Sequence, residues 1–241
     1  MFAGPNGSGK STFKLVVRPD LLGVYINPDE IEAQLRGGLG LDFQDYGIRA
    51  TNEDVEQFFS KSTLLNRNVP GEAESSLRFE DGKLHFTPAL PNSYVASVAA
   101  DFIRTRLLSA QAAFTFETVM SHPGKIELLR AARASDYRTY LYYVATDDPG
   151  INIARVGHRV KMGGHAVPED RIVSRYRRSL DLLLEAVRNT DRAYVFDNSG
   201  QGHVWLAEIT SGSTLELRSE LLPEWFQIAL WNEFTSAPAS A

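Results

Sequence analysis

The sequence predicts an α/β fold with a mostly parallel sheet flanked by helices. Short apolar runs alternate with helical patterns along the chain, which is the sequence form of βαβ units. A glycine-rich turn lies between the first apolar residues and a helical pattern. The chain has 241 residues, of which 43% are hydrophobic, and this suits one large domain that carries an insert.

The individual elements follow from these patterns in chain order. Apolar runs predict strands at residues 24–27, 113–117, 139–145, 194–197 and 204–209. Helical patterns predict helices at residues 10–17, 28–36, 94–109, 123–135, 149–162, 168–189 and 223–234, several of which begin with proline in the first turn. Only Met1, Phe2 and Ala3 precede the glycine-rich turn, so either the first strand is truncated or the natural chain begins earlier.

Residues 37–93 interrupt this alternation. Glycines at 37, 38 and 40 begin a polar stretch with one amphipathic segment at 53–65. An alternating run at 77–86 surrounds Asp81-Gly82, a strong signal for a β-hairpin. We interpret residues 37–93 as an inserted subdomain of a single domain 1–241. The insert either shapes what enters the site or decorates the surface.

Composition excludes several classes of protein. No apolar stretch approaches the roughly 20 residues of a membrane helix, so we expect no membrane association. The absence of cysteine excludes disulfides, thiolate catalysis and cysteine zinc sites. Because no cationic and apolar leader opens the chain, a cytoplasmic location is expected.

The net charge of −5 is unevenly distributed. Residues 155–178 contain seven lysines and arginines and two acidic residues, a net charge of +5 that leaves −10 for the remainder. An acidic body with one cationic segment suits a small, highly charged ligand better than a long polyanion, so we do not expect nucleic acid as a partner. A solvated basic helix face is the alternative reading.

The strongest motif is Gly4-Pro-Asn-Gly-Ser-Gly-Lys-Ser11, a full match to G-x-x-x-x-G-K-[ST] that we call the phosphate loop. In such loops the backbone N–H groups surround phosphate oxygens, the lysine contacts the β- and γ-phosphates, and the serine hydroxyl binds Mg²⁺. The sequence therefore predicts that ATP and Mg²⁺ bind here, with Ser11 as metal ligand. The predicted nucleotide-binding residues are Gly4, Pro5, Asn6, Gly7, Ser8, Gly9, Lys10, Ser11 and Thr12.

Asp29 lies just after the predicted strand 24–27, where ligands of open α/β sheets bind. A carboxylate there is a candidate general base that accepts a proton from a substrate hydroxyl. The alternative is purely local: Asn27 caps a helix, Pro28 occupies its first position, and the charges of Asp29 and Glu30 favour the helix dipole. Glu30 is expected on the surface.

Glu117 and Thr118 end another predicted strand. Glu117 is a candidate to hold a substrate hydroxyl or a metal-bound water, and the Thr118 hydroxyl lies beside it; a carboxylate in this place is otherwise simply solvated. Asp197 also ends an apolar run and could serve as a metal-site aspartate. It is ranked below Glu117 because it follows the cationic segment.

The arginines of the cationic segment recur at helical spacing. Arg155 and Arg159 are four residues apart on one predicted helix, and Arg171 and Arg175 repeat this spacing on the next. A glycine-containing turn at residues 162–168 lies between the two helices. Guanidinium groups that converge from two such helices are typical of a lid, placed here at 149–180, which closes over phosphates and excludes water.

Taken together, these motifs resemble the zeta toxin family of P-loop kinases. The resemblance rests on the phosphate loop, Asn27-x-Asp29, Phe116-Glu117-Thr118 and the Arg-Val-x-x-Arg-Val-x-x-Gly-Gly-His-x-Val-Pro run that begins at Arg155. It covers residues 4–36 and about 96–200, and the insert lies outside it. The resemblance implies a fold like that of nucleotide kinases.

Characterised members of that family phosphorylate the 3′-hydroxyl of the sugar in UDP-N-acetylglucosamine. An antitoxin protein inhibits them by blocking the ATP site. The resemblance thus implies a nucleotide-sugar substrate and a possible antitoxin partner. Lys10, Asp29, Arg159 and Arg175 would be catalytic, Ser11 would hold Mg²⁺, and the residues in contact with substrate would be Asn27, Glu117, Thr118, Arg155 and Arg171.

We therefore expect an ATP-dependent kinase that phosphorylates a hydroxyl of a nucleotide-linked small molecule, with UDP-N-acetylglucosamine first among the acceptors. Related effectors with this core phosphorylate a dinucleotide, so one alternative is a kinase of a dinucleotide such as NAD or of a polynucleotide end. A further alternative is a regulatory module that binds nucleotide without catalysis.

Overall fold

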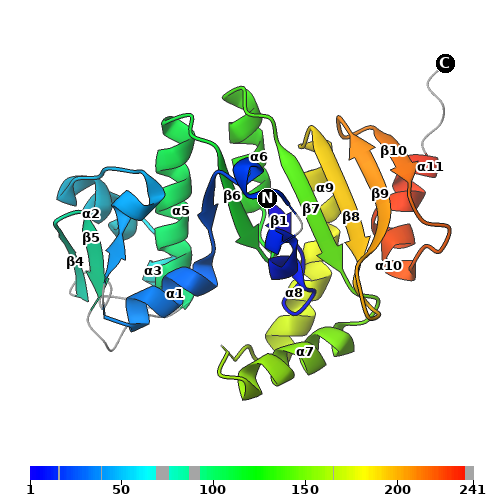
Figure 1. Cartoon of the computed structure of the whole chain (residues 1–241), viewed down its shortest axis with the longest axis horizontal. Helices are drawn as coiled ribbons and strands as arrows, with labels where there is room; N and C mark the ends of the chain where they lie inside the picture. Colours follow the sequence, from blue (N-terminus) through cyan, green and yellow to red (C-terminus); the bar gives the residue numbers. More distant parts are fainter. Residues whose placement is uncertain (16, 39, 69–75, 87–92, 165, 237–241) are drawn as a thin grey trace. The chain divides into compact units, whose positions relative to one another are not determined.

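The computed structural model describes the chain except residues 16, 39, 69–75, 87–92, 165 and 237–241. The chain divides into two compact units (Figure 1). The first unit consists of Met1–Arg18 and Glu117–Ala241, and the second of Pro19–Phe116. The boundary falls within strand β6 (Phe114–Thr118).

The strands form a seven-stranded, mainly parallel sheet in the order β10-β9-β8-β7-β1-β6-β2. β9 and β10 are antiparallel to their neighbours, and the other pairs are parallel. With β6, the strands are β1 Phe2–Ala3, β2 Val24–Ile26, β7 Tyr140–Ala145, β8 Arg192–Asp197, β9 Val204–Thr210 and β10 Thr214–Leu217. The predicted α/β class, the mostly parallel sheet and the five predicted strands are confirmed. β10 was missed because its largely exposed residues form no apolar run.

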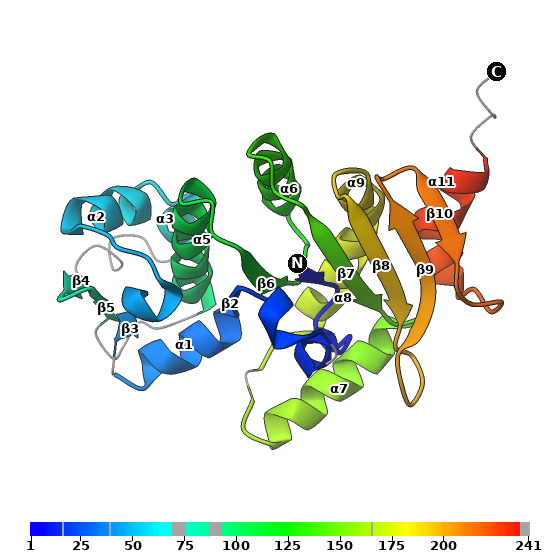
Figure 2. The same ribbon diagram turned by 45° about the horizontal axis from the view of Figure 1, so that its top comes forward.

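Helices α8 and α9 of the first unit lie behind β7 and β8 in both views, and α7 lies below these strands (Figures 1 and 2). Among the described residues, no helix is both long enough and apolar enough to cross a membrane. The helices are α6 Gly124–Ala134, α7 Pro149–Lys161, α8 Glu169–Asp181, α9 Leu183–Arg188, α10 Glu224–Phe226 and α11 Asn232–Thr235, with a π-helical turn at Gln227–Trp231.

Two helix predictions need correction. The helix expected at residues 10–17 is a six-residue 3-10 helix, η1 (Lys10–Leu15), and residue 16 lies outside the described chain. Pro19 follows closely, and the Thr12 hydroxyl donates back to the Gly9 carbonyl over 2.6 Å, which competes with regular helix bonding. The helix expected at 168–189 is divided into α8 and α9 by one turn residue, Leu182, although their buried side chains continue a single stripe.

The second unit contains the expected insert together with the helices on either side of it. Its elements are the 3-10 turns η2 Pro19–Leu21 and η3 Phe43–Tyr46, helices α1 Pro28–Arg36, α2 Asn52–Ser60, α3 Thr63–Asn68 and α5 Ser93–Ser109, and strands β3 Leu41–Asp42, β4 Leu77–Glu80 and β5 Lys83–Phe86. The three short strands form a separate sheet in the order β3-β5-β4. Asp81 and Gly82, with φ of 52° and 79°, form the predicted hairpin turn.

Phenylalanines fill the core of this unit. Phe102 of α5 stacks on Phe43 with ring centroids 5.2 Å apart. Phe58 of α2 makes an edge-to-face contact with the Phe102 ring, also with centroids 5.2 Å apart. Phe59 packs against Phe86 of β5 at 6.2 Å. Residues of the expected insert therefore share a hydrophobic core with α5, so this segment is an integral part of the unit.

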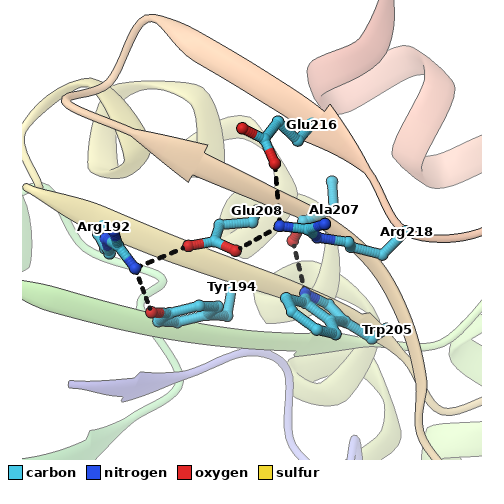
Figure 3. A network of polar contacts seen from close by, with 7 residues as sticks. All are labelled: Arg192, Tyr194, Trp205, Ala207, Glu208, Glu216 and Arg218. Atoms are coloured by element: carbon cyan, nitrogen blue, oxygen red, sulfur yellow. Dashed lines mark hydrogen bonds and ion pairs between the residues drawn. The ribbon is translucent and has the colours of Figure 1, made fainter.

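A polar network on the open face of the sheet joins β8, β9 and the residue after β10 (Figure 3). The half-buried carboxylate of Glu208 accepts from Arg192 at 3.0 Å and from Arg218 at 2.9 Å. Arg218 also contacts Glu216 and lies over the Trp205 ring, with 5.0 Å from Cζ to the centroid. One carboxylate shared by two guanidinium groups thus ties the antiparallel strands to the parallel part of the sheet.

Candidate functional site

The phosphate loop leaves the carboxyl end of β1, which lies between β6 and β7. The first N–H of the loop, from Gly4, donates to the carbonyl of Thr118 at the end of β6 over 3.3 Å. Gly7 and Gly9 have φ of 76° and 95°, values that side-chain-bearing residues rarely adopt. The motif thus forms a tight turn at the carboxyl edge of the sheet, where open α/β sheets bind ligands.

Lys10 folds back over this turn. Its Nζ donates to the carbonyl oxygens of Gly4 and Pro5, both at 2.8 Å. Two side-chain oxygens of the loop, Asn6 Oδ1 and Ser8 Oγ, are buried and have no hydrogen-bond partner within the described chain. An ammonium group over the turn and an unsatisfied hydroxyl suit a loop that takes phosphate oxygens as partners.

Ser11 and Glu117 meet at the end of the loop. The Ser11 hydroxyl donates to Glu117 Oε2 over 2.9 Å, although the two residues are 106 positions apart. A hydroxyl beside a carboxylate fits Mg²⁺, which takes oxygen ligands and commonly completes its shell with water and substrate phosphates. Within the described residues, no group of three or more histidine and acidic side chains could hold a metal without such added ligands.

The structure gives the neighbouring candidates different surroundings. The Thr118 hydroxyl accepts from the Met120 N–H at 3.0 Å and so stabilises the turn after β6. Asp197, only 7% exposed, accepts from Trp225 Nε1 at 2.9 Å and from the hydroxyl of Ser199 at 2.8 Å. The Asp197 carboxylate thus binds Trp225 and the turn after β8, whereas the Glu117 carboxylate binds Ser11 of the phosphate loop.

Sequence reasoning missed the side chains that hold the phosphate loop in place. Asn152 of α7 donates to the Asn6 carbonyl at 2.5 Å, and Asn198, just after β8, donates to the Ser8 carbonyl at 2.8 Å. His203 contacts the Thr12 hydroxyl through Nε2 at 3.2 Å. The sequence offered one local signal for these residues. Asn198 directly follows Asp197 at the end of a predicted strand, where ligand-binding side chains are common.

His203 lies on the loop between β8 and β9 and packs its ring edge-on against Phe13, with centroids 4.7 Å apart. Burial lowers the pKa of His203 below its ordinary value of 6.5. The positive charge of Arg155 lowers it further, while a hydrogen bond with the backbone of Gly9 acts in the opposite direction. Burial and the charge of Arg155 therefore favour the neutral form of this imidazole beside the phosphate loop.

The two helices of the expected lid, α7 and α8, contain both anchored and exposed residues. Tyr176 of α8 donates its hydroxyl to the Thr146 carbonyl at 2.6 Å, which anchors α8 beside the end of β7. Arg175 is half-buried next to this anchor, whereas Arg159 and Arg171 are exposed. The Gly164 N–H bonds the Arg159 carbonyl at 2.9 Å, so α7 ends in a turn. Residue 165 of the expected hinge lies outside the described chain.

Arg155 differs from the other arginines of the cationic segment in the contacts described here. Its Nη1 donates to the Asn198 carbonyl at 2.7 Å and its Nη2 to the Gly200 carbonyl at 3.2 Å. Both acceptors belong to the segment after β8 that also carries the bond to Ser8. The Arg155 guanidinium is therefore bound to the backbone of the segment that supports the phosphate loop at Ser8.

Asn27 and Asp29 belong to the second unit, at the start of α1. The Asn27 side chain caps α1 by accepting from the Asp29 N–H at 3.0 Å, and Pro28 is the first helical residue. The carboxylates of Asp29 and Glu30 are exposed. The local features of the capping alternative are thus all present, and the role of Asp29 as base stays a prediction.

Comparisons with known proteins give a fold and no family. No protein-family model matches the chain. An uncharacterized protein of Haemophilus influenzae is 33% identical over 63 residues, which are 26% of this chain and 45% of that protein.

Similar solved structures include complexes of AvrRxo1-ORF1 with AvrRxo1-ORF2. The complex with sulphate ions has a TM-score of 0.54 at 16% identity, and the complex with ATP has 0.52 at 15%. Both comparisons cover 100% of this chain and 64% of the other, so this chain spans less than two thirds of its structural neighbours. At such low identity the likeness shows the α/β fold alone.

Proposed function

We propose that this protein is an ATP-dependent kinase that transfers the γ-phosphate to a sugar hydroxyl of a nucleotide-linked small molecule. The observation that carries the proposal is the phosphate loop with Lys10 Nζ folded over it and the Ser11 hydroxyl on Glu117. One of the structures that share the fold is a complex with ATP, which supports ATP as the nucleotide.

The residues of this chain divide the chemistry between them. The loop N–H groups and Lys10 bind the β- and γ-phosphates, and Ser11 with Glu117 holds Mg²⁺, which neutralises phosphate charge when bound. The acceptor oxygen bonds to the γ-phosphorus as the bond from that phosphorus to the β–γ bridging oxygen breaks and ADP leaves. Asp29 takes the acceptor's hydroxyl proton, and Arg159 and Arg175 stabilise charge on the transferred phosphoryl group.

UDP-N-acetylglucosamine is the first acceptor in this proposal, because the motifs that resemble zeta toxins are those expected around the acceptor. Thr118, Asn27 and Arg171 would contact it. A protein that blocks the ATP site, as an antitoxin does, is part of the same proposal. The structural neighbours are themselves complexes of two proteins, AvrRxo1-ORF1 and AvrRxo1-ORF2, which supports it.

The test is transfer of label from ATP labelled in its γ-phosphate, with Mg²⁺ and a panel of UDP-sugars, NAD and oligonucleotides. We expect labelled UDP-N-acetylglucosamine. Label on NAD or on an oligonucleotide end would replace the acceptor and keep the enzyme class. ATP binding without transfer to any of them would favour a regulatory module.

The matched control is Lys10→Ala. Lys10 is a half-buried residue at the start of η1, so its removal should leave the melting temperature almost unchanged while transfer is lost. Transfer within tenfold of the wild-type rate would contradict the assignment of the phosphate loop.

A further inference from the structure

Two asparagines hold the backbone of the phosphate loop from opposite ends of its central turn. Asn152 donates to the Asn6 carbonyl at 2.5 Å and Asn198 to the Ser8 carbonyl at 2.8 Å. Both side chains are buried, with 0% and 9% of their surface exposed. Each side-chain amide therefore donates to a loop carbonyl in a place that solvent hardly reaches. Loss of such a buried hydrogen bond lowers the stability of the folded protein.

The glycines of the loop allow this close approach. A Cβ atom at Gly7 would lie 2.7 Å from the Asn152 carbonyl oxygen, and one at Gly9 would collide with the Asn198 amide nitrogen. Both positions also have positive φ. The loop, α7 and the segment after β8 thus fit together only because these two positions lack side chains.

Arg155 connects the two supports. It follows Asn152 by three residues on α7 and so lies on the same side of that helix. Its fork donates to the carbonyls of Asn198 and Gly200 at 2.7 and 3.2 Å, while the Asn198 N–H donates to the Ala145 carbonyl at 2.8 Å. Among the bonds of the described residues, removing the guanidinium would leave Asn198 with the one from its N–H to Ala145 and the one from its side chain to Ser8.

We propose that Arg155 and Asn198 are positioning residues of the phosphate loop. Arg155 fixes the segment 198–200, Asn198 fixes the Ser8 carbonyl, and the loop N–H groups are thereby held in the direction that phosphates require. Arg155 acts through this chain of bonds and not as a lid arginine that contacts a phosphate. The inference rests on the proposed nucleotide site.

A consequence is that the first half of α7 belongs to the fixed nucleotide site. Asn152 and Val156 are buried, and Arg155 is bound to backbone. The helix becomes exposed from residue 157 onward, where Arg159 lies.

The test is a double-mutant cycle on ATP affinity, measured by calorimetry with Arg155→Ala, Asn198→Ala and the double variant. If both residues act through the same bonds, each single change weakens ATP binding by about tenfold and the double change weakens it hardly more. If Arg155 contacts a phosphate directly, the two losses multiply to about a hundredfold, and the inference is overturned.

Two further variants separate positioning from general stability. Asn198→Asp keeps the shape of the side chain but places an oxygen against the Ser8 carbonyl, so ATP affinity should fall at least as far as with alanine. Because the buried carboxylate also lowers the melting temperature, affinity is compared at a temperature at which each variant is folded. Arg155→Lys keeps the charge but loses the fork, so it should not restore ATP binding. Restoration by lysine would overturn the inference.

Lys161→Ala is the matched control, since it removes one positive charge from the exposed end of α7. It should bind ATP as the wild type does. If the wild-type protein itself binds no ATP, the proposed function and this inference both fall. If it binds ATP and both single variants bind equally well, the proposed function stands and this inference falls.

Discussion

The hydroxyl of Ser11 donates a hydrogen bond to the Glu117 carboxylate over 2.9 Å, which joins the phosphate loop to the end of β6. The pairing places a carboxylate beside the one residue of the loop that is expected to bind Mg²⁺. Of the two roles considered for Glu117, holding a substrate hydroxyl or holding a metal-bound water, this contact favours the one at the metal. The choice has a direct experimental consequence.

Glu117→Gln should raise the Mg²⁺ concentration needed for half-maximal transfer. Glutamine can still accept the Ser11 bond but has no negative charge to attract the cation. Titration of Mg²⁺ at saturating ATP measures the effect, and Glu185→Gln on the exposed side of α9 is the control. An unchanged Mg²⁺ requirement with a raised KM for the acceptor would assign Glu117 to substrate binding instead.

Asp29→Asn should lower the transfer rate by roughly 10² to 10⁴ with ATP affinity almost unchanged, if Asp29 is the proton acceptor. The structure adds a matched variant, because the side chain that caps α1 is Asn27. Asn27→Ala should destabilise the protein by about 1 kcal/mol through loss of that cap. Normal turnover in Asp29→Asn, with only a lowered melting temperature, would leave the aspartate a helix-dipole role alone.

Arg159→Lys and Arg175→Lys should each lower the transfer rate by orders of magnitude, because an arginine finger contributes about 10³ to 10⁵ in rate and lysine lacks its planar fork. Arg177→Lys should be nearly silent. Arg175 is half-buried beside the anchor at Tyr176, whereas Arg177 is exposed. Single-turnover rates at saturating ATP make the comparison, and equal behaviour of all three variants would reduce the segment to a diffuse positive patch.

Stability near the phosphate loop should depend on the protonation of His203. Its pKa is lowered in the folded protein by burial and by Arg155, so the unfolded chain binds the proton more readily. This contribution is therefore present above pH 6.5 and is lost as the pH falls below that value.

Melting temperatures between pH 5 and pH 8 measure this dependence, with His203→Gln as the variant that cannot titrate. The wild type should lose more stability than the variant as the pH falls through that range. Parallel curves for the two proteins would show that the imidazole titrates normally.

Much of the local structure was determined by the sequence itself. The bounds of α1, the turn at Asp81 and Gly82, five strands of the seven-stranded sheet and the phosphate loop all follow from short-range chemistry. Glycine permits positive φ, proline fixes the first turn of a helix, and apolar period distinguishes strand from helix. These constraints act between neighbours in the chain, so they can be read without the fold.

The tertiary structure alone decided which residues meet. The insertion of β1 between β6 and β7 places Ser11 on a carboxylate 106 residues away, and the loop after β8 reaches Ser8 from 190 residues along the chain. Asn152, Asn198 and His203 belong to no motif, and the spacing of Arg155 gives no sign that its guanidinium donates to the carbonyls of Asn198 and Gly200. Such contacts arise from strand order and helix packing, which no local pattern encodes.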